Sequence, residues 1–154
     1  MKLLVLSDSH GARANLKRFE LLARELKPDY VIHLGDHADD LDMLDVPGRK
    51  LAVRGNCDLF SYEPPLRAET FGGVDVMLCH GHHYGVKSGL DNLEAAANSR
   101  GAKLALFGHT HQSIAKQCAN TLLINPGAVV NGYPSCALIE LEKGEIRSYD
   151  ILTF

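Results

Sequence analysis

Short apolar runs that each end in a polar cluster are the feature that most constrains the fold of this chain. Residues 2–7 read KLLVLS and lead into Asp-Ser-His-Gly, and residues 30–34 read YVIHL and lead into Gly-Asp-His. Continuous apolar runs of this length are typical of strands that are buried on both faces of a sheet. The sequence therefore predicts buried strands whose carboxyl ends carry polar side chains.

The segment between these two runs has the periodicity of an amphipathic helix. Its apolar residues fall on one stripe, which consists of Leu16, Phe19, Leu22, Ala23 and Leu26. We expect Asn15 or an earlier small residue to cap this helix and Pro28 to end it. Strand, helix and strand in this order predict a parallel sheet with a right-handed crossover.

The rest of the chain repeats the pattern. Gly72-Gly73 predicts a hairpin turn, and we expect a second helix at residues 88–100, with Ser88 as its N-cap and Gly101 at its carboxyl end. Further strands are expected at residues 51–54, 67–71, 74–79, 103–107, 121–125, 137–142 and 145–152. The predicted fold class is α/β, with ligands bound where parallel strands end.

Composition excludes several classes of protein. The 154 residues suit one domain spanning residues 1–154, and 45% of them are apolar. The net charge of -3 provides no basic surface, which argues against a nucleic acid polymer as partner. We see no signal peptide and no apolar stretch of membrane length, so no membrane partner is expected. The four cysteines form no C-x-x-C pair, which favours a reducing, cytoplasmic location. The sequence is compatible with a homo-oligomer.

The residues that follow the predicted strands have the chemistry of metal ligands. They are Asp8, His10, Asp36, Asn56, His80, His109 and His111. Imidazole, carboxylate and amide groups together suit Mn, Fe, Zn or Ni better than Mg or Ca. The D-x-H and H-x-H spacings would work if residues i and i+2 near a strand end point the same way.

A pair of such ions would need a bridging carboxylate. Two metals about 3.5–4 Å apart clamp the reacting oxygens of an in-line displacement at phosphorus. Asp36 is the central candidate for the carboxylate that both ions share.

Each candidate also has an ordinary structural interpretation. Asp8 could be a helix cap, Asp36 and Asn56 each follow a glycine and could be turn residues, and His80 or His82 could be a simple loop histidine. However, five separate strands would have to end in potential ligands by accident. The joint pattern therefore favours a metal site.

The motifs, in the order D-x-H, G-D, G-N-x-D, H-G-H and G-H-x-H, resemble those of the calcineurin-like metallophosphoesterases. The resemblance extends from Lys2 to about Gly127. Residues 80–87 with the helix that follows, the short G-N-C-D form and Asn125-Pro126-Gly127 resemble the small YfcE-type phosphodiesterases.

This resemblance implies a four-layer α/β/β/α sandwich of two mixed sheets flanked by helices. It also implies a metal-dependent phosphodiesterase that hydrolyses small phosphodiesters with a hydroxide shared by two divalent transition metals, Mn first and Ni, Fe or Zn as alternatives. By motif, one ion would be held by Asp8, His10, Asp36 and His111. The other would be held by Asp36, Asn56, His80 and His109.

One position departs from the family pattern. Many members carry a histidine, thought to protonate the leaving oxygen, where this chain has Cys57. A thiol with a reference pKa of about 8.5 is a poorer proton donor near pH 7 than imidazole. His82 or His37 could supply the proton instead. Cys57 could also be a small buried filler, and Asp58 a turn residue or one that orients its neighbours.

Two other functions remain as alternatives. A nuclease of the same superfamily would usually carry a capping domain and a basic track, for which this chain has no room. A non-catalytic scaffold of the same fold would have lost ligands, whereas no ligand position is empty here.

Overall fold

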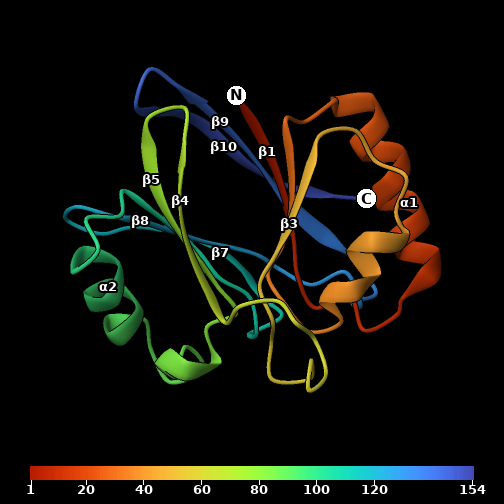
Figure 1. The fold of residues 1–154 in the computed structure, drawn as a ribbon, viewed down its shortest axis with the longest axis horizontal. Helices are drawn as coiled ribbons and strands as arrows, with labels where there is room; N and C mark the ends of the chain where they lie inside the picture. Colours follow the sequence, from red (N-terminus) through yellow and green to blue (C-terminus); the bar gives the residue numbers. More distant parts are fainter.

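The computed structural model describes residues 1–154 as two five-stranded sheets packed face to face, with a helix on each outer face (Figure 1). The predicted four-layer α/β/β/α architecture with two mixed sheets is therefore confirmed. No helix is long and apolar enough to cross a membrane.

The first sheet has the strand order β10-β9-β1-β2-β3. Its strands are β1 (Lys2–Leu6), β2 (Tyr30–His33), β3 (Arg49–Ala52), β9 (Ser135–Glu142) and β10 (Glu145–Thr153). Strands β1, β2 and β3 are parallel, and β9 pairs antiparallel with β1. Helix α1 (Arg13–Leu26) and the 3-10 helix η1 (Ala38–Met43) connect the parallel strands and cover the outer face.

The second sheet has the strand order β4-β5-β6-β8-β7. Its strands are β4 (Leu66–Phe71), β5 (Val74–Cys79), β6 (Leu104–Leu106), β7 (Ser113–Gln117) and β8 (Leu122–Pro126). Strands β5, β6 and β8 are parallel, and β4 and β7 are antiparallel edges. The 3-10 helix η2 (His82–Tyr84) and helix α2 (Asp91–Asn98) follow β5, and α2 packs on the outer face.

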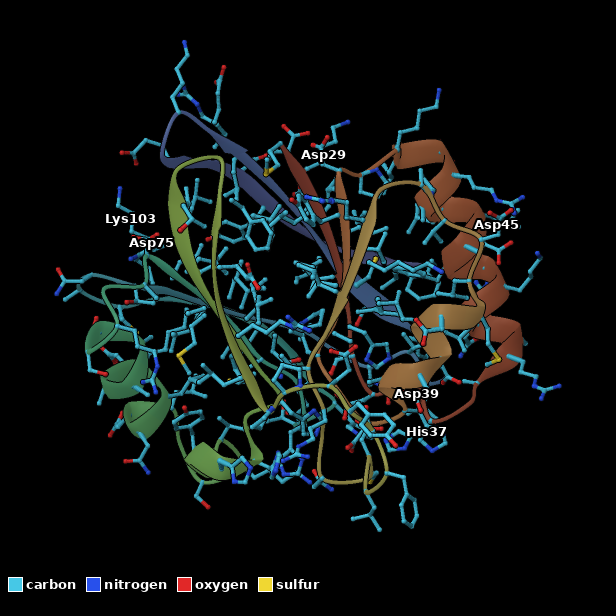
Figure 2. All side chains as sticks on the ribbon, in the orientation of Figure 1. Asp29, His37, Asp39, Asp45, Asp75 and Lys103 are labelled. Atoms are coloured by element: carbon cyan, nitrogen blue, oxygen red, sulfur yellow. The ribbon has the colours of Figure 1, made fainter.

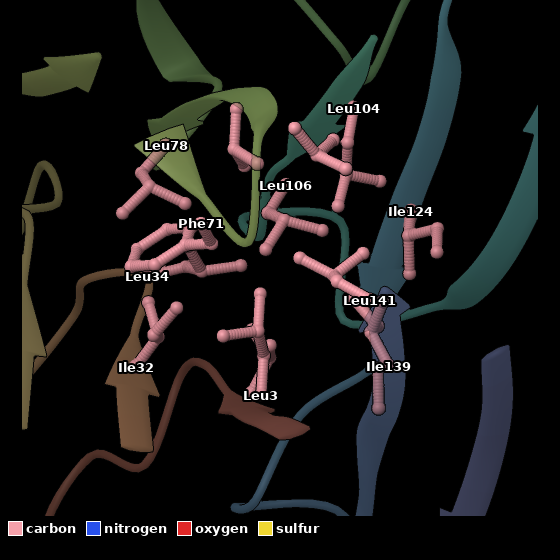
Figure 3. Packing of buried hydrophobic residues seen from close by; sticks show 14 of the residues in the cluster. Leu3, Ile32, Leu34, Phe71, Leu78, Leu104, Leu106, Ile124, Ile139 and Leu141 are labelled. Atoms are coloured by element: carbon pink, nitrogen blue, oxygen red, sulfur yellow. The ribbon is translucent and has the colours of Figure 1, made fainter. Parts of the chain in front are cut away.

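The alternation of side chains along each buried strand builds the layers. In β1, Leu3 and Val5 face the other sheet, while Leu4 and Leu6 face α1. In β5, Val76 and Leu78 face the other sheet, whereas Met77 and Cys79 face α2. Figure 3 shows the resulting packing between the sheets. Full burial of such a side chain contributes about 1.5–3 kcal/mol relative to exposure.

Helix α1 begins after an earlier small residue, which was one of the two predicted alternatives, whereas α2 begins differently from the prediction. Ala12 occupies the N-cap of α1 without a side-chain hydrogen bond, and Asn15 instead donates to the carbonyl oxygen of Val129 at 2.7 Å. Helix α2 starts at Asp91 after Leu90, so the predicted cap at Ser88 is wrong. Gly89, just after the predicted cap, has a φ of 147°, which no helix can include. Helix α1 ends at Leu26, just before Pro28, as predicted.

Strand β7 was not predicted from the sequence. All its residues are exposed, and it lies at the edge of its sheet, paired only with β8. An edge strand of this kind buries no apolar face and therefore lacks the periodic signal on which strand prediction depends.

The parallel strands of both sheets end on the same side of the molecule. In Figure 2, Asp29 and Lys103, which precede β2 and β6, lie at one end, whereas His37, which follows β2, lies at the other. The loops after β1, β2, β3, β5 and β6 therefore meet where the two sheets come together.

Candidate metal centre

The loops that carry the predicted ligands have an unusual backbone. Six non-glycine residues in them have positive φ: Asp8 (53°), His10 (45°), Asp36 (60°), His37 (65°), His109 (70°) and His111 (59°). Left-handed backbone is unfavourable for residues with a Cβ and clusters at functional sites. The D-x-H and H-x-H residues thus converge through left-handed turns. The strand alternation proposed from the sequence is not the reason.

The carboxylate of Asp8 has one satisfied and one unsatisfied oxygen. Its Oδ2 accepts hydrogen bonds from Ser7 Oγ at 2.6 Å and from the backbone N–H of His109 at 3.0 Å. Its Oδ1 is buried without a hydrogen-bond partner and lies 3.1 Å from His111 Nε2. A buried oxygen without a partner is costly and needs an explanation.

His80 presents a second buried atom without a partner. Its Nδ1 donates to the carbonyl oxygen of Leu34 at 2.7 Å, which leaves the lone pair on Nε2. That Nε2 has no hydrogen bond, yet it lies 3.4 Å from Asp36 Oδ2 and 3.9 Å from Asp8 Oδ1. An imidazole nitrogen and two carboxylate oxygens therefore converge on a space that suits a cation.

Asp36 lies between the other candidates. Its Oδ1 accepts the backbone N–H of Cys57 at 2.8 Å, while its Oδ2 lies 3.7 Å from His10 Nε2. Burial alone would raise the pKa of Asp36, but the adjacent His80 and the Cys57 N–H hold it well below its usual range. Burial would likewise lower the pKa of His80, yet Asp36 and Asp8 raise it. The carboxylate is therefore ionised at neutral pH.

The potential ligand atoms form groups that share Asp36 or His10. The atoms of each group lie within 4.8 Å of one another, and the groups are Asp8, His10 and His111; Asp36, His80 and His109; and His10, Asp36 and Cys57. Six of the seven residues predicted as ligands are thus brought together. Asn56 is exposed, and the only hydrogen bond of its side chain goes to Cys57 Sγ at 3.4 Å.

Cys57 and His82, two of the three residues considered as proton donors, differ in their surroundings. Cys57 is exposed, so the interpretation as a buried filler is wrong. Partial burial and the carboxylates of Asp36 and Asp58 raise the pKa of its thiol. Burial and the neighbouring histidines, His83 first, lower the pKa of His82 to about 4. At neutral pH the thiol holds its proton, whereas the imidazole of His82 is neutral.

Asp58 fixes the backbone around Asp36. Its Oδ2 accepts the N–H of Asp36 at 2.8 Å and that of Gly55 at 2.7 Å, and its Oδ1 accepts the N–H of His37 at 2.7 Å. These hydrogen bonds explain how the left-handed backbone conformation of two successive residues, Asp36 and His37, is held in place. The interpretation of Asp58 as a residue that orients its neighbours fits this geometry.

A buried chain of hydrogen bonds supports the loop between Asp8 and His10. The N–H of Gly35 donates to His33 Nδ1 at 3.1 Å, so Nε2 carries the proton and donates to Ser9 Oγ at 2.9 Å. The Ser9 hydroxyl donates to Asp40 Oδ2 at 2.6 Å. Sequence reasoning missed Ser9, His33 and Asp40. The only signal was a histidine inside an otherwise apolar strand.

Two asparagines anchor the loop that carries His109 and His111. Asn125 donates to the carbonyl oxygen of Gly108 at 2.8 Å and to Thr110 Oγ1 at 3.1 Å. Asn131 donates to the carbonyl oxygen of His111 at 3.0 Å. The Asn125-Pro126-Gly127 motif therefore acts by holding a loop of potential ligands.

These residues fit a centre for divalent transition metals. The donors are imidazole nitrogens and carboxylate oxygens, and two of the atoms directed into the site are buried without partners. Hydrolytic chemistry at such a centre uses the metal as a Lewis acid and as a source of activated water. The fold and the site thus have the features of a metal-binding hydrolase of the α/β/β/α sandwich class.

The chain belongs to the calcineurin-like phosphoesterase superfamily, whose domain model matches residues 1–144. It is 32% identical to the probable metallophosphoesterase YsnB of Bacillus subtilis (strain 168), over 97% of this chain and 91% of that protein. It is 28% identical to the phosphodiesterase YfcE of Escherichia coli (strain K12), over 84% of this chain and 79% of that protein. The predicted YfcE-type resemblance is therefore confirmed.

The fold is shared more widely. The structure of wild-type Vps29 from Entamoeba histolytica complexed with Zn²⁺ superposes with a TM-score of 0.76 at 21% identity, covering 100% of this chain and 98% of that one. At this identity the likeness concerns the fold alone.

Proposed function

We propose that this chain is a phosphodiesterase that hydrolyses small phosphodiesters at a centre of two divalent transition metals. The observation that carries the proposal is the pair of buried atoms without partners, Asp8 Oδ1 and His80 Nε2, which face each other at 3.9 Å beside the ionised Asp36. Two ions, one bound by Asp8 and the other by His80, would remove the cost of burying both atoms.

The proposed ligands of one ion are Asp8, His10, Asp36 and His111. Those of the other are Asp36, Asn56, His80 and His109. Asn56 would join by rotation of its side chain, which is exposed. We propose Mn²⁺ as the first candidate and Ni²⁺, Fe²⁺ or Zn²⁺ as alternatives, because imidazoles and carboxylates suit these ions.

Bound ions would activate a water and neutralise charge on the phosphoryl oxygens. The chain's own residues would position the reacting groups. Asp8 and His80 each use one polar atom for a structural hydrogen bond and keep the other free. Asp58 keeps Asp36 in a left-handed backbone conformation, in which its carboxylate lies close to His10 in one group of potential ligands and to His80 in another.

Protonation of the leaving oxygen sets the preferred substrates. Cys57 keeps its proton because its pKa is raised, which also makes it a weak acid toward an alkoxide. With its pKa near 4, the imidazole of His82 is almost entirely in its neutral form at pH 7 and is a poor proton donor. We therefore propose that diesters with good leaving groups are favoured over ordinary phosphomonoesters.

The test is a panel of substrates and metals. Metal-free protein is reconstituted with Mn, Ni, Fe, Zn or Mg and assayed with bis(p-nitrophenyl) phosphate, p-nitrophenyl phosphate and single-stranded DNA. We expect a transition metal to restore activity and the small diester to give the highest kcat/KM. Equal activity in excess chelator would refute metal dependence, and a preference for the monoester or for DNA would refute the substrate class. Protein that binds no metal would support the scaffold alternative.

A further inference from the structure

A cavity of about 460 Å³ lies beside the site, between the segment that joins η2 to α2 and the edge strand β7. Its apolar walls come from Val86, Leu90, Phe107 and Ile114. Cavities that bind small molecules usually measure about 300–1,000 Å³ and combine apolar walls with a few polar groups. This cavity is far larger than the phosphoryl group itself needs.

One wall of the cavity belongs to the loop of potential ligands. Thr110, which lines the cavity, lies between His109 and His111 in the sequence. Its hydroxyl accepts a hydrogen bond from Asn125 Nδ2 at 3.1 Å, so its position is fixed. A phosphoryl group beside these imidazoles would therefore have the cavity as its immediate neighbour.

Lys87 gives the cavity an unused positive charge. This residue is exposed and makes no ion pair or side-chain hydrogen bond, although it lines the cavity together with Gln112.

Cys57 belongs to a different part of the site. It groups with His10 and Asp36, whereas His109 groups with Asp36 and His80. Figure 1 shows the loop after β3, which carries Cys57, apart from the segment that leads into α2. If the leaving oxygen takes its proton on the Cys57 side, the other organic arm of the diester points toward the cavity.

We propose that this cavity binds the retained arm of the substrate, a nucleoside-sized organic group whose own anionic substituent pairs with Lys87. The inference rests on the proposed function and names the class of diester that the same site would accept. A nucleoside covers the apolar walls and offers polar atoms to Gln112 and Thr110, whereas a methyl arm leaves the cavity wet.

The experiment varies the retained arm and keeps the leaving group constant. The substrates are methyl p-nitrophenyl phosphate, thymidine 3′-(p-nitrophenyl phosphate) and the latter with a 5′-phosphate, each assayed with the metal-loaded protein. In every case the oxygen of water bonds to phosphorus and its proton passes to solvent. The bond to p-nitrophenolate breaks, and its electron pair leaves with that group.

We expect kcat/KM to be about tenfold higher with the thymidine arm than with methyl, which is typical of filling an apolar pocket. The 5′-phosphate should add about threefold, as expected for an exposed ion pair. Ile114→Trp fills the cavity from β7 and should bring the thymidine-to-methyl ratio close to one. Ala115→Trp, on the same exposed strand but outside the cavity, should keep the ratio.

Lys87→Gln should remove the effect of the 5′-phosphate, while Lys87→Arg should keep it. Ser113→Phe is a second filling variant if Ile114→Trp does not fold. Equal kcat/KM for all three substrates in the unmodified protein, or a ratio that both filling variants leave intact, would overturn the inference alone. Failure to hydrolyse any of the diesters would overturn the proposed function and the inference with it.

Discussion

The two oxygens of Asp8 show how single residues prepare this site. One oxygen is held by Ser7 and the backbone of His109, and this fixes the direction of the other, which has no partner. His80 is divided in the same way between Leu34 and the site. A residue that is oriented in this manner needs little rearrangement to bind an ion, because its position is already determined.

Asp36 is the residue whose loss should be most damaging. Asp36→Asn preserves the shape of the side chain but removes the negative charge that two of the three groups of potential ligands share. We expect kcat to fall by at least about 10³-fold, since loss of a shared ligand impairs the water activation and charge stabilisation that metals supply. Metal bound per chain, measured by plasma emission spectrometry, should fall below that of variants that remove a ligand of one ion.

Asp39→Asn provides the control for this prediction. Asp39 lies three residues further along the chain, in η1, and is exposed, so its variant should keep metal content and kcat close to the unmodified values. If Asp36→Asn retained two ions and near-normal kcat, the bridging assignment would be wrong.

Cys57→His tests the missing proton donor. We expect little gain with p-nitrophenolate as leaving group, because this ion needs little protonation near neutral pH. Poorer leaving groups should gain about 10-fold, less than the ~10²–10⁴-fold of an aligned general acid, because the surrounding groups are not arranged for imidazole. The measurement is log kcat/KM against leaving-group pKa, which should have a shallower slope for the histidine variant.

Parallel lines for the two proteins would contradict a role for this position in proton transfer. Cys57→Ala separates the remaining explanations. If its kcat/KM matches that of the unmodified protein at every leaving-group pKa, the thiol takes no part in catalysis.

At the level of single residues, the sequence predicted the potential ligands but not the residues that hold their loops in place. The ligands could be recognised because each follows an apolar run. Ser9 contacts His33 and Asp40 across 24 and 31 residues of sequence, and no local pattern marks such a contact. The exposed position of Asn56 was also beyond prediction, since it depends on a loop conformation.

Among the secondary-structure elements, prediction succeeded where burial imposed a pattern. Strands β1, β2 and β5 were recognised because both of their faces are covered. Strand β7 was missed because it is exposed throughout, and α2 was predicted too long because Gly89, inside the predicted range, has a non-helical φ of 147°. Apolar periodicity was weakest in elements whose position is set by neighbouring loops rather than by burial.

The carboxyl ends of β1 and β6 approach so closely that only glycine fits at the contact. A Cβ at Gly108 would collide with Ser7 Oγ and lie 2.9 Å from Asp8 Oδ2. We expect Gly108→Ala to lower the free energy of unfolding by about 1–3 kcal/mol, the usual cost of overpacking. It should also reduce metal affinity, because Asp8 must move. Urea unfolding and metal titration by calorimetry would measure the two effects.

Gly132→Ala is the matched control, since its Cβ would meet no atom within 4 Å. This variant should change the free energy of unfolding by less than about 0.5 kcal/mol, as is usual for exposed positions. Equal effects of the two substitutions would show that the contact between β1 and β6 is not as tight as described.

For the whole molecule, site and stability depend on the same region. The potential ligands come from loops of both sheets, so the packing that joins the sheets also sets the distances within the site. Buried titratable groups near this junction then make the stability of the protein depend on pH.

Together with His82, whose pKa is also near 4, His33 should account for much of this dependence on the acid side in metal-free protein. Burial lowers its pKa from 6.5 to about 4, so the folded state favours the neutral imidazole. Between these two pKa values the unfolded chain binds the extra proton. The contribution of His33 is therefore complete above pH 6.5 and is lost as pH falls toward 4. From pH 7 to pH 4.5 we expect a loss of about 2 kcal/mol, since each unit of pKa shift corresponds to about 1.4 kcal/mol.

Urea unfolding at several pH values in the presence of chelator, for the unmodified protein and His33→Gln, isolates this contribution. Glutamine can still donate toward Ser9 but does not titrate, so the variant should be less stable at pH 7 and should lose about 2 kcal/mol less on acidification. Carboxylates with lowered pKa, such as Asp36, affect both proteins equally and lose their contribution only at lower pH. Parallel pH profiles for the two proteins would mean that His33 binds its proton in the folded state as readily as in the unfolded chain, and that its burial does not control acid stability.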